Sequence, residues 1–174
     1  MARILALDLS TNCGFCIGDV EADGPPEQFG FWRLAPYADR GRMMAGLRNS
    51  IEDVFADRKF QNIAIEQRPP ASRFAGRTNS DSTDQQAYLE ATVFLACYDL
   101  RGPLPEIVSP RLARSRVFGS YMTNITQKEK TDGVLVRKLQ AMGHKVYDHN
   151  AADALTIWLW LQMKAHGKKK NVRG

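Results

Sequence analysis

Arg3-Ile4-Leu5-Ala6-Leu7-Asp8-Leu9 combines an apolar run with an acid, Asp8, near its end. A second apolar run, Asn62-Ile63-Ala64-Ile65-Glu66, ends on an acid in the same way. Short apolar runs of this kind are typical of buried strands. A carboxylate at the end of a buried strand is costly unless something compensates its charge. A third acid, Asp153, stands at the start of a strongly apolar segment, within Asn150-Ala151-Ala152-Asp153-Ala154-Leu155.

These three acids predict a metal site. Three carboxylates brought together repel one another unless a divalent cation neutralises them. Mg²⁺ prefers oxygen ligands and keeps several waters, so two or three carboxylates and a substrate phosphate suit it. Two such ions roughly 4 Å apart activate a water and stabilise the leaving oxygen in phosphodiester hydrolysis. We therefore expect Asp8, Glu66 and Asp153 to hold two Mg²⁺ ions, for which Mn²⁺ would substitute, with Asp148 as a fourth ligand or a solvated link residue.

The composition is that of one ordinary globular domain. The chain has 174 residues, of which 44% are apolar and 25% charged. We expect one domain over residues 1–174, with a basic C-terminal tail from about residue 164. No apolar run reaches the roughly 18 residues that span a bilayer. Because the N-terminus enters a strand-like run directly, we predict no signal peptide and a cytoplasmic protein.

The charge suits a polyanionic partner, although a net charge of +5 is modest. Basic residues gather at the C-terminus and in the stretch after Glu66, where Arg68, Arg73 and Arg77 lie. The basic tail either solubilises the end of the chain or contacts phosphate.

Cys13 and Cys16 form a C-x-x-C motif, and Cys97 is the third cysteine. The motif suggests a redox pair or half a zinc site, but a second cysteine or histidine pair is missing. We therefore expect reduced thiols packed near a hairpin.

The remaining pattern predicts a mixed sheet covered by helices. Residues 3–9 and 14–18 form a hairpin, residues 28–33 a third strand and residues 39–55 a crossover helix, so the strand ending at Glu66 runs parallel to the first. We then expect a loop at 68–80 and a helix at 84–98, capped by Ser82 and Gln85. A strand at 104–108 and a helix at 111–118 follow. The last elements are a helix from the capping box Thr126–Glu129 to Gly143, a strand or link at 145–147, and a helix at 151–164. This order indicates an α/β fold.

Three motifs together resemble the RuvC-like Holliday-junction resolvases, above all the divergent forms of bacteriophages and related bacteria. They are Leu5-Ala6-Leu7-Asp8-Leu9-Ser10, Ile63-Ala64-Ile65-Glu66-Gln67 and His149-Asn150-Ala151-Ala152-Asp153-Ala154-Leu155. The resemblance spans nearly the whole chain. It implies an RNase H-like fold and a homodimer that cuts branched DNA, such as four-way junctions, by paired phosphodiester hydrolysis.

The resemblance also assigns site residues. Asp8, Glu66 and Asp153 match three of the family's four acidic positions. Asn150 stands at the fourth position, where an asparagine coordinates through its carbonyl oxygen but brings no charge; Asp148 or His149 is the alternative ligand.

Basic and aromatic positions carry over as well. Lys130, with Lys128 close by, matches the family's basic residue that holds the scissile phosphate, so Lys130 is counted as catalytic. Arg114 matches a second family lysine, and a change from lysine to arginine keeps the charge but alters the geometry. Phe74 is the aromatic available as a wedge into the junction, and Arg68, Arg73 and Arg77 surround it as DNA contacts.

Each acid also has a structural alternative. Asp8 could be a turn residue, Glu66 could pair with an arginine, and Asp153 could be a first-turn acid favoured by the helix dipole. Asn150 is also a candidate N-cap without metal contact.

Two other functions stay open: an RNA-directed nuclease of the same fold, and a branched-DNA-binding protein with weak or no catalysis. The chain is too short for an actin-like ATPase. We expect the dimer to form through the helix at 84–98.

Overall fold

The computed structural model describes residues 2–34, 39–67, 80–122 and 133–171. Its centre is a five-stranded sheet in the order β3-β2-β1-β4-β5. The strands are β1 (Arg3–Asp8), β2 (Asn12–Asp19), β3 (Gln28–Arg33), β4 (Asn62–Glu66) and β5 (Glu106–Val108). β2 is antiparallel to both β1 and β3, whereas β4 is parallel to both β1 and β5. The predicted mixed sheet is confirmed.

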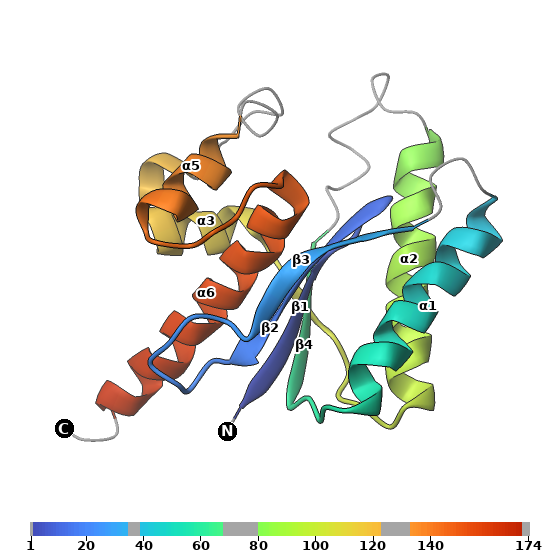
Figure 1. Ribbon diagram of the computed structural model, residues 1–174, viewed down its shortest axis with the longest axis horizontal. Helices are drawn as coiled ribbons and strands as arrows, with labels where there is room; N and C mark the ends of the chain where they lie inside the picture. The colour runs from blue at the N-terminus through green and yellow to red at the C-terminus, as the bar shows by residue number, and fades with distance from the viewer. Residues whose placement is uncertain (1, 35–38, 68–79, 123–132, 172–174) are drawn as a thin grey trace.

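Helices cover both faces of the sheet (Figure 1). One face carries α1 (Arg40–Ala56) and α2 (Ser80–Asp99), which pack against each other. The other carries α3 (Pro110–Phe118), α5 (Val134–Ala141) and α6 (His149–Asn171), with the short 3-10 turn η2 (Ser120–Met122) after α3. The strand side chains divide between two apolar clusters because successive residues of a strand point to opposite faces. Leu5 and Leu7 pack on the α1 side, and Ile4 and Ala6 on the α6 side.

α6 is the central helix of its layer, since residues 150–159 are all buried. A helix that is apolar all round is a buried helix. It contacts β1, β2, β3 and β4, so its first turns lie over the middle of the sheet. No helix among the described residues is long and apolar enough to cross a membrane.

Several predicted boundaries are wrong. The first strand ends at Asp8, and its hairpin partner is longer than predicted. α2 begins at Ser80, so the capping box at Ser82 and Gln85 does not mark its start. The capping box at Thr126–Glu129 lies outside the described residues. Residues 145–147 form an extended link rather than a strand.

The final helix begins at His149, earlier than predicted, and extends to Asn171. The carboxylate Oδ1 of Asp148 accepts hydrogen bonds from the backbone N of Asn150 (2.9 Å) and of Ala151 (3.0 Å). An acidic side chain that accepts from the first free N–H groups of a helix is its N-cap. Asp148 therefore caps α6, and the expectation that Asn150 is the cap is wrong.

Candidate metal centre

Sheet register places Asp8 and Glu66 side by side. β1 and β4 run parallel, with Leu7 opposite Ile65, so the next residue of each strand stands at the same edge of the sheet. Leu7 and Ile65 pack toward α1, and the alternation of a strand therefore turns both acids toward α6. Both acids are half-buried.

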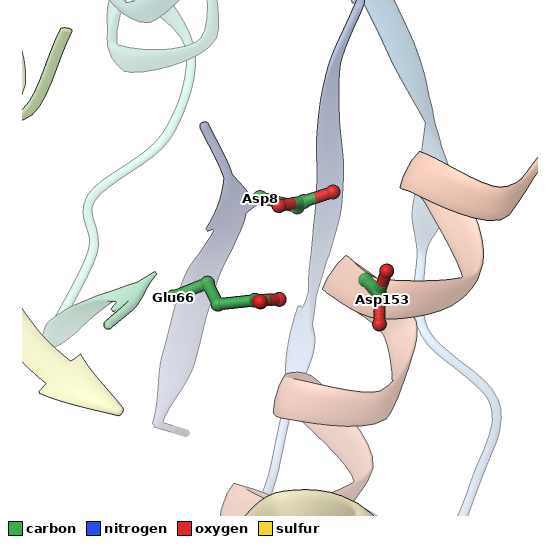
Figure 2. A group of neighbouring side chains, drawn as sticks. All are labelled: Asp8, Glu66 and Asp153. Carbon is green, nitrogen blue, oxygen red and sulfur yellow. The ribbon is translucent and has the colours of Figure 1, made fainter. Parts of the chain in front are cut away.

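Asp153 completes the group from α6. It stands about one turn into the helix and is only 3% exposed. Figure 2 shows the three carboxylates converging from two strand ends and one helix. One ligand oxygen from each of the three lies within 4.8 Å of the others. Three elements that are far apart in the sequence thus build one compact acidic centre.

The donor set fits a divalent cation of the Mg²⁺ class. All three groups offer carboxylate oxygens, the ligands that Mg²⁺ and Mn²⁺ prefer. Two half-buried carboxylates and one buried carboxylate this close together repel one another in the absence of a cation. The turn, ion-pair and helix-dipole alternatives for the individual acids do not explain why all three converge.

Asp148 and His149 lie beside this centre but outside the three-acid group. Asp148 uses Oδ1 to cap α6, and its Oδ2 lies 4.0 Å from Nδ1 of His149. Asn150 is buried, and its Oδ1 lies 3.3 Å from the hydroxyl of Ser10. That hydroxyl donates a 2.8 Å hydrogen bond to the carbonyl of Asn12. Asn150 therefore ties α6 to the turn between β1 and β2, directly after Asp8.

Gly14 sets how closely α6 approaches the sheet. It pairs with Asp8 across the β1–β2 ladder. A Cβ atom at Gly14 would lie 2.0 Å from the carbonyl oxygen of Asn150, far inside van der Waals contact. The absence of a side chain at Gly14 thus allows the first turn of α6, and Asp153 with it, to reach the acidic edge.

The cysteines take no part in the centre. Cys13 and Cys16 project to opposite faces of β2, into different apolar clusters. All three cysteines are free and buried. Burial, and secondarily the nearby Asp8 carboxylate, raises the pKa of the Cys13 thiol, and burial raises the pKa of Cys16. Both thiols stay protonated at neutral pH, as expected for packed side chains.

Arg114 is buried on α3, with 7% of its surface exposed. Its Nε finds no hydrogen-bond acceptor among the described residues. α3 follows β5 directly, and the last residue of β5, Val108, pairs with Glu66, so this helix begins beside the acidic edge. An unsatisfied buried donor costs free energy.

The other predicted nucleic-acid contacts lie outside the described residues. They are Arg68, Arg73, Phe74, Arg77, Lys128 and Lys130. Their predicted roles stay predictions. Lys164, at the start of the predicted basic tail, bonds Glu106 of β5 at 3.0 Å and lies over the ring of Trp160.

Sequence reasoning missed Ser10 and Gly14. The S-T-N turn after Asp8 signalled a hairpin, but the partner of Ser10 lies 140 residues away in the sequence. A glycine inside a strand is the one signal that could have pointed to the close approach of α6.

The mixed five-stranded sheet and the acidic centre define an α/β fold with a candidate metal site at the ends of two parallel strands. The chain matches no protein-family model and no curated protein. Among solved structures it is similar to Thermus thermophilus RuvC, with a TM-score of 0.70 and 15% identity over 95% of this chain and 96% of that one.

Two further structures agree. T. thermophilus RuvC in complex with a Holliday junction substrate superimposes with a TM-score of 0.72 and 15% identity, covering 96% of this chain and 97% of that one. The yeast mitochondrial Holliday junction resolvase Ydc2 gives a TM-score of 0.59 and 16% identity, covering 99% of this chain and 83% of that one. The fold is therefore RuvC-like, within the RNase H-like class, as the three sequence motifs predicted.

Proposed function

We propose that this chain is a divalent-metal-dependent endonuclease that resolves Holliday junctions or other branched DNA. The observation that carries the proposal is the convergence of Asp8, Glu66 and Asp153, in a fold that RuvC shares over nearly its whole length. The DNA junction bound in the related RuvC structure supports branched DNA as the substrate.

In this proposal, Asp8, Glu66 and Asp153 hold two Mg²⁺ ions, with Asn150 adjoining as a neutral oxygen donor. When bound, the ions activate a water and stabilise the leaving oxygen of the scissile phosphodiester. Mn²⁺ would replace Mg²⁺, because the donors are all oxygen atoms. The burial of Asp153 within α6 fixes one carboxylate rigidly, while Asp8 and Glu66 face the open edge where a phosphate enters.

The protein's own cations position the DNA. Arg114, on the helix that begins beside the acidic edge, would contact a DNA phosphate through the outer end of its guanidinium group, since its Nε is buried. Lys130 would contact the scissile phosphate, with Lys128 beside it. Arg68, Arg73 and Arg77 would contact the DNA backbone, and Phe74 would enter the junction. Recognition then follows mainly backbone shape and phosphates rather than bases.

We further propose one nuclease domain over residues 1–174, a homodimer that makes paired cuts, and phosphate contact by the basic C-terminal tail. Action in the cytoplasm of a bacterial or phage-infected cell belongs to the same proposal.

The test compares cleavage of a labelled four-way junction with that of linear duplex and an RNA–DNA hybrid in Mg²⁺ and in Mn²⁺. We expect paired nicks near the branch, reduced more than about 100-fold in Asp8→Asn and Asp153→Asn. Mg²⁺ should raise the melting temperature of the wild type but not of Asp153→Asn. Cleavage of the hybrid alone would assign the RNA-directed alternative. Tight junction binding with no cleavage would assign a binding protein.

A further inference from the structure

Phe31 lies in the same row of the sheet as Asp8. Asp8 pairs with Gly14 across β1 and β2, and Gly14 pairs with Phe31 across β2 and β3. Two strand spacings separate the Cα atoms of Asp8 and Phe31, which is roughly 10 Å. Since Gly14 has no side chain and lies beneath the first turn of α6, that turn stands between the two residues.

Phe31 faces the same side of the sheet as the acidic centre. Phe29, two residues earlier, packs in the apolar cluster on the α6 side together with its partner Cys16. The intervening residue faces the other way: Trp32 stacks on Phe15, with ring centroids 4.7 Å apart, in the cluster on the α1 side. Strand alternation therefore places Phe31 and Arg33 together on the α6 side.

Both side chains are available to a partner. Phe31 is 42% exposed although it is a large apolar residue, and Arg33 is exposed. β3 is the outer strand of the described sheet on this side, with no further strand paired to it among the described residues. Phe31 and Arg33 stand two residues apart on the strand, so their Cα atoms are roughly 7 Å from each other.

An exposed aromatic ring beside a cation matches one nucleotide of an unpaired strand. Bases stack on aromatic side chains without regard to sequence, and a neighbouring arginine binds the phosphate. Phe31 and Arg33 lie on the same side of the sheet as the acidic centre, across the first turn of α6 from it. The chain carries a net charge of +5, so a polyanion that reaches the centre also suits this pair. A branch point exposes bases that linear duplex keeps stacked.

We propose that Phe31 and Arg33 form a nucleotide contact: an unpaired base beside the branch stacks on Phe31, while Arg33 binds an adjacent phosphate. This inference rests on the proposed function, since it takes the strand that crosses the acidic centre as its ligand. Phe31 and Arg33 position DNA and take no part in the chemical step.

The experiment measures junction binding in Ca²⁺, with 2-aminopurine at single positions next to the branch. Phe31→Ala should weaken binding roughly five- to 100-fold and remove the quenching of one 2-aminopurine, and Phe31→Trp should restore both. Arg33→Gln should weaken binding and reduce the slope of log K against log salt by roughly 0.7 to 0.9, the contribution of one phosphate.

Two matched controls lie far from the acidic edge. Met163→Ala removes a side chain with 41% exposure, nearly that of Phe31, from the later turns of α6. Lys59→Gln removes an exposed cation before β4, at the opposite edge of the sheet. Neither should alter the fluorescence. Melting temperatures of all variants show whether each is folded, and if Phe31→Ala fails to fold, Arg33→Gln and Phe31→Trp still carry the test.

The outcomes separate the two proposals. Failure of the wild type to bind or cut the junction contradicts the proposed function. If the wild type binds and cuts, but the Phe31 and Arg33 variants bind and quench like the controls, the nucleotide contact is wrong and the proposed function stands. A change in oligomeric state with unchanged DNA binding would also overturn the contact, because the outer edge of β3 would then be a protein interface.

Discussion

Asn150 determines the charge of the acidic centre. The centre has three carboxylates, and the position three residues before Asp153 holds a neutral amide. That amide is buried and lies 3.3 Å from the hydroxyl of Ser10. A neutral side chain here limits repulsion in the metal-free protein, and it also removes one charge that would attract a cation.

Asn150→Asp tests this balance. We expect the fourth carboxylate to raise Mg²⁺ affinity roughly 10-fold or more and to lower stability in EDTA by about 1–2 kcal/mol, a fall of several degrees in melting temperature. Isothermal titration with Mg²⁺ and Mn²⁺ resonance spectra give the affinity and the number of bound ions. Asp148→Ala is the control: it removes the cap of α6 and so lowers stability, but leaves metal affinity nearly unchanged. Equal metal affinity in Asn150→Asp and the wild type would show that Asn150 lies outside the metal site.

The contact between α6 and β2 determines where Asp153 lies relative to the other two acids. Gly14 is where helix backbone and strand backbone come closest, and the turn of α6 that meets it is followed directly by Asp153. Any side chain at Gly14 must push this turn away from the sheet. Because Asp153 moves with its helix, such a change acts on the acidic centre from a residue that bears no functional group.

Gly14→Ala should therefore reduce both stability and activity. We expect a loss of about 1–3 kcal/mol in the free energy of unfolding, since the overlap is with backbone that cannot rotate aside, together with a smaller Mg²⁺-induced rise in melting temperature. Gly24→Ala is the matched control, because a Cβ there meets no atom within 4 Å. Denaturant unfolding with and without Mg²⁺ measures both effects. An unchanged response to Mg²⁺ in a folded Gly14→Ala protein would show that the position of α6 does not control the centre.

The elements with local patterns and the pairing of the two acid-bearing strands were predictable, whereas the close packing of α6 on the sheet was not. The apolar runs that end at Asp8 and Glu66 predict parallel strands and hence adjacent acids. Asp153 was added to that pair because it stands at the start of the last apolar segment, and the resemblance assigned it the same role. The predicted N-cap of the last helix was wrong because Asp148 and Asn150 are both good cap residues. Only the backbone geometry shows which of them caps the helix. The burial of Arg114 and the close approach of the α6 backbone to Gly14 both depend on how α6 packs against its neighbours. The pattern of a short segment does not predict such packing.

Across the part of the chain that the structure describes, α2 presents an apolar stripe that the fold leaves exposed. Leu89, Val93, Ala96 and Cys97 of α2 are buried in the core, whereas Tyr88, Ala91, Leu95 and Tyr98 are exposed on its outer side. The exposed residues are spaced three, four and three apart, which is the seam of a helix that packs against another helix. Leu95 is 58% and Tyr98 77% exposed. This stripe is on the layer opposite α6, away from the face on which we propose that DNA binds.

If the predicted dimer forms through this stripe, two-fold symmetry brings each residue of α2 against the same helix of the second copy. Leu95→Glu then places two like charges in one apolar contact, and we expect the protein to become monomeric at micromolar concentration by light scattering. Met142→Glu, a change at a similarly exposed residue just after α5 in the other layer, should leave the oligomeric state as it was. A monomer keeps its acidic centre and its Mg²⁺-induced thermal shift, but one centre cuts one strand. Leu95→Glu should therefore convert paired cuts of a junction into single nicks.

Two outcomes would contradict this prediction. Paired cutting by a confirmed monomer would show that paired cleavage needs no dimer. A dimer that persists in Leu95→Glu would show that its interface lies elsewhere.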